Sequence, residues 1–144
     1  HVHTTATMAV CSHEGGLLPT NFYACGFQGQ IGYHDFEGVT VRAEEGERLV
    51  RNLGNHRILM LRNHGPVVMG RTLPEMFMTM WALQRACEIQ VATLSMGQPV
   101  LVSDSVLEVH QRDLSVMQSQ GGAGVFDFEA WKRKITRIDD SWQR

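Results

Sequence analysis

The chain has 144 residues, of which 43% are hydrophobic and 19% are charged, and its formal net charge is −2 with the seven histidines counted as neutral. This composition is typical of one globular domain with a substantial core, and it excludes disordered, fibrous and strongly basic proteins. No apolar stretch approaches the roughly 18 residues that a membrane helix needs, so we expect no membrane partner.

Three cysteines, Cys11, Cys25 and Cys87, lack the spacing of a metal site. An odd number of cysteines without a signal peptide favours a reducing compartment. We therefore predict free, mostly buried thiols and a cytoplasmic location. The basic sequence WKRKITR at 131–137 alternates with apolar residues, which indicates the outer face of a terminal helix. We expect no nucleic-acid partner.

The first half of the chain predicts two short helices, an irregular segment and a buried strand. Residues 4–14 have a threonine-rich start and predict a helix that the following Gly-Gly sequence ends. Residues 21–40 are rich in glycine and aromatic residues and predict short strands and turns. Residues 44–55 predict a brief helix that Gly54 closes. The apolar run at 57–65 predicts a strand buried on both faces of a mixed or parallel sheet, followed by a tight turn and a second strand.

The most regular helix is predicted over 72–97, with Thr72 as its cap, Pro74 in its first turn and Gly97 at its end. Its apolar residues recur at spacings of three and four. We predict that they form one core-facing stripe, made of Met76, Phe77, Met80, Leu83, Cys87, Val91 and Leu94.

Two further helices are predicted at 103–119 and at about 127–138, with a loop at 121–124 between them. Strands and helices alternate along the chain, which indicates an α/β fold. The sequence contains no nucleophile elbow, phosphate-binding loop or dinucleotide fingerprint.

His1 and His3 stand one residue apart in the sequence HVHTT. On a β-strand, side chains at i and i+2 point to the same face, so such a pair presents two imidazoles to one point. A third ligand would complete a metal site with positions left for water or substrate. The alternative is a pair without a ligand role, since chain ends fray.

His64 lies in LRNHGP, directly after the predicted buried strand Ile58–Leu61, where the chain enters a Gly-Pro turn. Ligands of α/β folds bind at the ends of sheet strands, which favours a functional role for His64. The alternative is a structural histidine that bonds to the carbonyls of the turn. Asn63 beside it is a natural turn residue that can hold the loop through side-chain bonds to the backbone.

The stretches HVHT, LRNHG and RTLPEMFMTMWALQRACEIQ, in this order and spacing, resemble the class II aldolase/adducin-like domain. The region from GQIGYHDFEGVTV to MGRTLPEMF is similar to the adducin-like bacterial branch. The resemblance runs from His1 to about Gly97. It implies a three-layer α/β/α sandwich with a mixed central sheet, in which residues 1–144 form a single domain that lacks its N-terminal part.

By position, the resemblance implies that His1, His3 and His64 hold a divalent metal, most often zinc, with Asn63 and Gly65 in support. In such enzymes the metal is a Lewis acid that acts on a small hydroxylated carbonyl, sugar-like substrate. It stabilises the enediolate formed when a C–C bond breaks, or when a proton or carboxylate leaves. The resemblance also implies a cyclic homotetramer.

The N-terminal part of the family's domain supplies an anion-binding Gly/Ser segment and the acidic residue that acts as general acid/base. We expect both upstream of His1, and we expect this chain to be weakly active or inactive without them. Glu37 is a candidate substitute for the carboxylate. His34 is a candidate for contact with the metal ligands, or else a solvated turn histidine. The alternative functions are a catalytically inactive adducin-like interaction or oligomerisation module, and a structural domain with incidental histidines.

Overall fold

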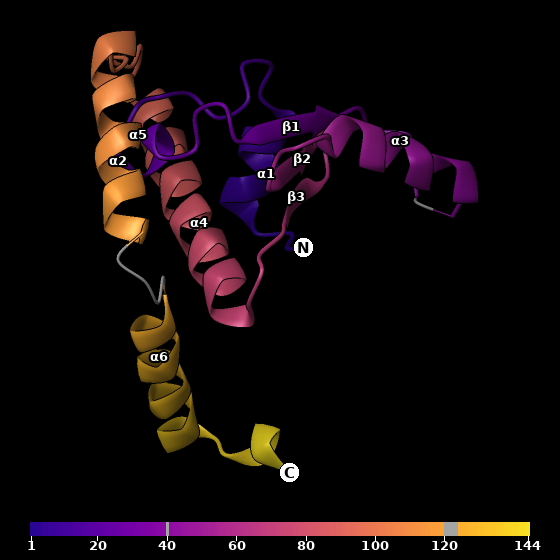
Figure 1. Cartoon of the computed structure of the whole chain (residues 1–144). Helices are drawn as coiled ribbons and strands as arrows, with labels where there is room; N and C mark the ends of the chain where they lie inside the picture. Colours follow the sequence, from indigo (N-terminus) through magenta and orange to yellow (C-terminus); the bar gives the residue numbers. More distant parts are fainter. Residues whose placement is uncertain (40, 120–123) are drawn as a thin grey trace.

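The computed structural model describes residues 1–39, 41–119 and 124–144, and it contains a three-stranded mixed sheet (Figure 1). The strands lie in the order β1 (Ile31–His34), β2 (Ile58–Leu61) and β3 (Gly65–Val68). β1 pairs with β2 in parallel, and β3 pairs with β2 in the antiparallel sense. All four residues of β2 are buried, which confirms the predicted strand.

Six α-helices occur within the described ranges, and none of them is long and apolar enough to cross a membrane. They are α1 (Thr5–Ser12), α2 (Phe22–Cys25), α3 (Ala43–Leu53), α4 (Leu73–Ser95), α5 (Asp104–Ser119) and α6 (Val125–Ile138), followed by a 3₁₀ turn at Ser141–Gln143.

The alternation of side chains along the strands decides which helices cover each face of the sheet. Ile58 and Met60 face a core shared with α1 and α4. Gly32 faces the other way, and a Cβ atom there would lie 2.4 Å from the backbone oxygen of Asn52 in α3. In Figure 1, α4 and α3 accordingly lie on opposite sides of the sheet. This arrangement is the predicted α/β/α layering with a mixed sheet.

Capping residues mark several helix ends as predicted. The Thr4 and Thr72 side chains accept hydrogen bonds from the backbone of the first turns of α1 and α4. α3 ends at Gly54, whose φ of 53° suits glycine. α6 begins at Val125, two residues before the predicted start, and the predicted loop at 121–124 lies outside the described residues except for Gly124.

The segment at 21–40 contains a predicted short strand, β1, but it also contains the short helix α2, which was not predicted. The Asn21 side chain accepts a hydrogen bond from the Ala24 N–H and caps this helix. In α4, Leu83 and Cys87 are buried as predicted, but Val91 is 39% exposed and the neighbouring Gln90 is fully buried. Gln90 continues the 83–87 face at helical spacing, and its amide bonds to two backbone groups of an adjacent loop.

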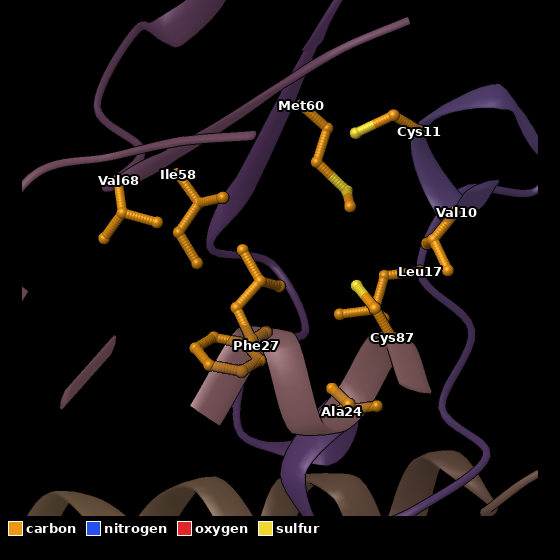
Figure 2. Packing of buried hydrophobic residues seen from close by; sticks show 11 residues of the cluster. Val10, Cys11, Leu17, Ala24, Phe27, Ile58, Met60, Val68 and Cys87 are labelled. Atoms are coloured by element: carbon orange, nitrogen blue, oxygen red, sulfur yellow. The ribbon is translucent and has the colours of Figure 1, made fainter. Parts of the chain in front are cut away.

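The predicted free, buried thiols are confirmed. Figure 2 shows Cys11 and Cys87 among the apolar side chains between the sheet and α4. Burial raises the pKa of both thiols to about 12, and it also raises the pKa of Cys25.

Because the thiolate is the reactive form, we expect the native protein to show almost no reaction with Ellman's reagent at pH 8. The same protein in urea should release three equivalents of the coloured product, which serves as the control. Rapid reaction of any thiol in the native protein would contradict the burial described above.

Candidate metal centre

His1, His3 and His64 lie together at the end of β2. One potential ligand nitrogen from each ring lies within 4.8 Å of the other two, and the ring centroids are 4.6 to 4.9 Å apart. In the part of the chain that the structure describes, no other three His, Cys, Asp or Glu side chains meet this condition, and no carboxylate joins the three histidines. We call these three residues the histidine triad.

The β2–β3 turn presents His64. The His64 N–H donates to the Leu61 carbonyl at 3.2 Å, which closes the turn. Asn63 has a φ of 55°, a left-handed conformation that asparagine adopts more readily than most residues. The turn residue Asn63 therefore sets the direction in which His64 leaves the sheet.

His1 and His3 lie directly before α1, and residues 1–4 belong to no strand, so the assumption that the pair occupies a β-strand is wrong. The chain is instead fixed by Thr4, the cap of α1. The Thr4 hydroxyl donates a 2.5 Å hydrogen bond to Oε1 of Gln84 in α4. A distant helix therefore anchors the residue that follows His3.

Gly65 allows the N-terminal segment to approach β3. A Cβ atom at this position would lie 2.4 Å from the Val2 carbonyl oxygen, 3.2 Å from the His3 ring and 3.5 Å from the His1 ring. Any side chain larger than hydrogen would push these histidines away. Glycine is required here by close packing rather than by an unusual backbone angle.

The hydrogen bonds of the triad show whether its nitrogens suit a metal. His1 Nδ1 lies 2.9 Å from the Pro66 carbonyl oxygen, which can only accept, so Nδ1 carries the proton and Nε2 of the neutral ring is free to bind a cation. That Nε2 lies 2.8 Å from Nε2 of His3. Two nitrogens bound to one zinc ion at about 2.1 Å lie no more than about 4.2 Å apart, so small side-chain rotations suffice. The triad fits a divalent cation.

The triad borders an apolar groove of about 800 Å³. His1 and His3 are exposed and His64 is half-buried, so the ligand nitrogens remain accessible. Apart from the triad, the groove is lined by apolar side chains and one glycine from β2, β3, the residue after β3, α3 and the loop after β1. They are Phe36, Gly38, Val39, Leu49, Val50, Leu53, Leu59, Leu61, Val67 and Met69.

His34 and Glu37 lie next to this groove but outside the triad. His34 is 3% exposed at the end of β1, so the alternative of a solvated turn histidine is wrong. The Glu37 carboxylate accepts hydrogen bonds from Arg48 at 2.7 and 2.5 Å. Those bonds hold the pKa of Glu37 below its ordinary value and raise the pKa of Arg48.

Sequence reasoning missed two residues that fix segments near the triad, namely Gln84, which binds Thr4, and Arg48, which binds Glu37. Gln84 is 80 positions from Thr4 and Arg48 is 11 positions from Glu37, and the local sequence around either residue does not indicate its partner. The one available signal was the spacing of Glu45 and Arg48, which places both on one side of α3.

Comparison with known proteins gives the family. Residues 1–91 match the class II aldolase and adducin N-terminal domain family. The chain is 36% identical over 141 residues to a Caulobacter vibrioides protein named "Putative aldolase class 2 protein", covering 96% of this chain and 53% of that protein. It is 42% identical over 142 residues to human gamma-adducin, covering 96% of this chain and 20% of that protein.

Solved structures agree with the fold. An aldolase II superfamily protein from Pseudomonas syringae has a TM-score of 0.93 at 29% identity, covering 100% of this chain and 58% of that chain. An L-fuculose 1-phosphate aldolase from Glaciozyma antarctica has a TM-score of 0.75 at 20% identity, covering 97% and 51%, a likeness of fold alone. This chain spans about half the length of the bacterial relatives it matches. It belongs to the class II aldolase and adducin family.

Proposed function

We propose that the histidine triad binds one divalent cation, with zinc as the first candidate. The observation that carries this proposal is the convergence of three ring nitrogens within 4.8 Å from two separate segments of the chain. The Pro66 carbonyl supports it, because it fixes His1 in the form that leaves Nε2 free. Three neutral imidazoles leave the full charge of the cation available for a ligand.

We further propose that the protein is a metal-dependent lyase of the aldolase type. Bound to the triad, the cation would supply Lewis-acid chemistry toward the oxygens of a small hydroxylated carbonyl substrate. The three histidines that would hold the cation border the open groove, and its apolar walls would limit the access of water from that side. No carboxylate joins the triad within the described residues, so we assign proton transfer to none of them.

From the resemblance to this family, we propose a homotetramer with a small-molecule substrate. The second candidate function is an adducin-like interaction module without catalysis. The observation in its favour is the 42% identity with human gamma-adducin. Convergent imidazoles favour the enzyme, because an interaction module has no need of three of them.

The test combines metal analysis with an assay of aldol cleavage. Purified protein is incubated with zinc, freed of unbound metal and analysed by mass spectrometry, and the expected result is one zinc ion per chain. The same protein is then assayed for aldehyde release from a panel of hydroxylated ketones, with the chelator-treated protein as the control. Absence of stoichiometric metal would contradict the metal centre. Because no carboxylate of the described residues joins the triad, bound metal with little turnover is expected under both candidate functions, whereas turnover above the chelator-treated control would contradict a module without catalysis.

Replacement of Gly65 by alanine is expected to weaken zinc binding about 10- to 100-fold, as changes behind metal ligands do. The added methyl group collides with the Val2 carbonyl and displaces the segment that carries His1 and His3. The measurement is a competitive titration of zinc against a chelator. The matched control is Gly46→Ala in α3, where a Cβ meets nothing within 4 Å. Unchanged zinc affinity in Gly65→Ala would show that the N-terminal segment does not depend on this contact.

A further inference from the structure

A polar cluster lies beside the triad and has no part in the function proposed above. It contains His34 at the end of β1, Glu37 in the loop that follows, and Glu45, Arg48 and Asn52 of α3. We call it the His34 cluster. The buried His34 ring accepts a hydrogen bond at Nδ1 from the side-chain nitrogen of Asn52, at 2.9 Å. Its Nε2 lies 3.7 Å from a carboxylate oxygen of Glu37 and 3.7 Å from one of Glu45.

The geometry of His34 is costly for the fold. With Nδ1 accepting, the neutral ring carries its proton on Nε2, and this buried nitrogen has no hydrogen-bond partner among the described residues. An unsatisfied buried donor destabilises a protein, whereas an apolar side chain of similar shape would not. The Nε2–H group instead faces the carboxylates of Glu37 and Glu45, with one oxygen of each at 3.7 Å.

The loop after β1 is fixed on both sides of Phe36. On one side, the His34 carbonyl accepts a hydrogen bond from the Arg62 N–H at 2.8 Å, which ties the end of β1 to the turn that presents His64. On the other side, the two hydrogen bonds from Arg48 hold Glu37 against α3. Two anchors within four residues leave the intervening backbone little freedom.

Phe36 occupies the position that these anchors define. Its ring centroid lies 6.3 Å from that of His64, with the planes at 76°, an edge-to-face contact within the usual range for aromatic pairs. Phe36 also lines the groove together with His1 and His3. The ring is 56% exposed, so the rest of the fold packs around it loosely and the anchors decide its place.

We propose that the His34 cluster positions Phe36 against His64, so that the aromatic ring shields one side of the metal centre and restrains the His64 ring. His34 and Glu37 are then positioning residues that act through Phe36. This inference rests on the metal site proposed above. Release of Glu37 from Arg48 should free the loop and let Phe36 leave His64.

The first test uses metal-free protein, so its result does not depend on metal binding. The carbon-bound proton of the His64 ring is followed by NMR, since a nearby aromatic ring shifts its resonance. Phe36→Ala removes that ring and defines the shift. Glu37→Gln should move the resonance in the same direction, while Glu47→Gln, the same change at an exposed position of α3, should not. A Glu37→Gln resonance at the wild-type position would overturn the proposal.

The second test measures how fast zinc passes from the loaded protein to an excess of chelator. Loss of one aromatic contact should accelerate zinc release about 2- to 10-fold in Phe36→Ala and in Glu37→Gln. If Glu37 acts through Phe36, the double variant should release zinc no faster than Phe36→Ala alone. If the two substitutions together accelerate zinc release by the product of their separate factors, the proposal is overturned.

Arg48→Met removes the other partner of Glu37 and serves as the second variant if Glu37→Gln fails to fold. It should behave as Glu37→Gln does in both tests. Protein that binds no zinc would contradict the metal centre, and the NMR comparison would then still decide whether the His34 cluster positions Phe36.

Discussion

Replacement of His64 by alanine is expected to abolish stoichiometric zinc binding. His64 is the one residue of the triad that the β2–β3 turn supplies, and His1 and His3 alone would leave two imidazoles on an exposed segment. Substitution of residues that orient metal ligands already lowers metal affinity about 10- to 100-fold, so loss of a ligand should lower zinc affinity more than about 100-fold. Competitive titration against a chelator of known affinity measures this difference.

The control for His64→Ala is His110→Ala in α5, which removes a half-buried histidine that contacts Phe22 rather than the triad. Its zinc affinity should equal that of the wild type. The far-ultraviolet circular dichroism of both variants should match the wild type, because His64 contributes no core packing. Equal zinc binding by His64→Ala and wild type would refute the triad as the binding site.

The three histidines that the structure brings together could be predicted from sequence, as could Asn63 and Gly65 beside them, but the contacts from distant elements could not. A histidine pair and a histidine after a buried strand are recognisable in the local sequence. The resemblance to a family then connected the three histidines through their spacing. The contact between Thr4 and Gln84 leaves no such signal, since the two residues are 80 positions apart. The pairing of Glu37 with Arg48 depends in the same way on how α3 lies against β1.

In the fold as well, features that depend on adjacent residues could be predicted, whereas those that depend on distant contacts could not. Caps such as Thr72 and a four-residue buried strand such as β2 depend on adjacent residues, and both were predicted. The helical turn at Phe22–Cys25 was missed, because aromatic residues favour strands and the Asn21 cap outweighed that preference. The buried face of α4 was predicted one residue off at its end. Hydrophobic spacing favoured Val91, whereas the loop beside α4 needs a polar partner.

Replacement of Gln90 by methionine is therefore expected to lower the free energy of unfolding by about 3 kcal/mol. The Gln90 side chain accepts a hydrogen bond from the Leu18 N–H and donates one to the Gly16 carbonyl, each at 2.8 Å. Methionine has a similar length but leaves both backbone groups unpaired in the interior. Urea unfolding followed by circular dichroism gives the change in free energy, provided that the m-value is unaltered.

The matched control is Val91→Ala, one residue further along α4. Because Val91 is 39% exposed, truncation should change the free energy of unfolding by no more than about 0.5 kcal/mol. The loop that Gln90 holds also donates a hydrogen bond from the Leu17 N–H to the Tyr33 hydroxyl, and the Tyr33 ring stacks under Arg62. A more mobile loop should therefore also increase the mobility of the turn that carries His64, through the contact of Tyr33 with Arg62. A larger loss in Val91→Ala than in Gln90→Met would mean that hydrophobic spacing, rather than the needs of the buried backbone, determines this face of α4.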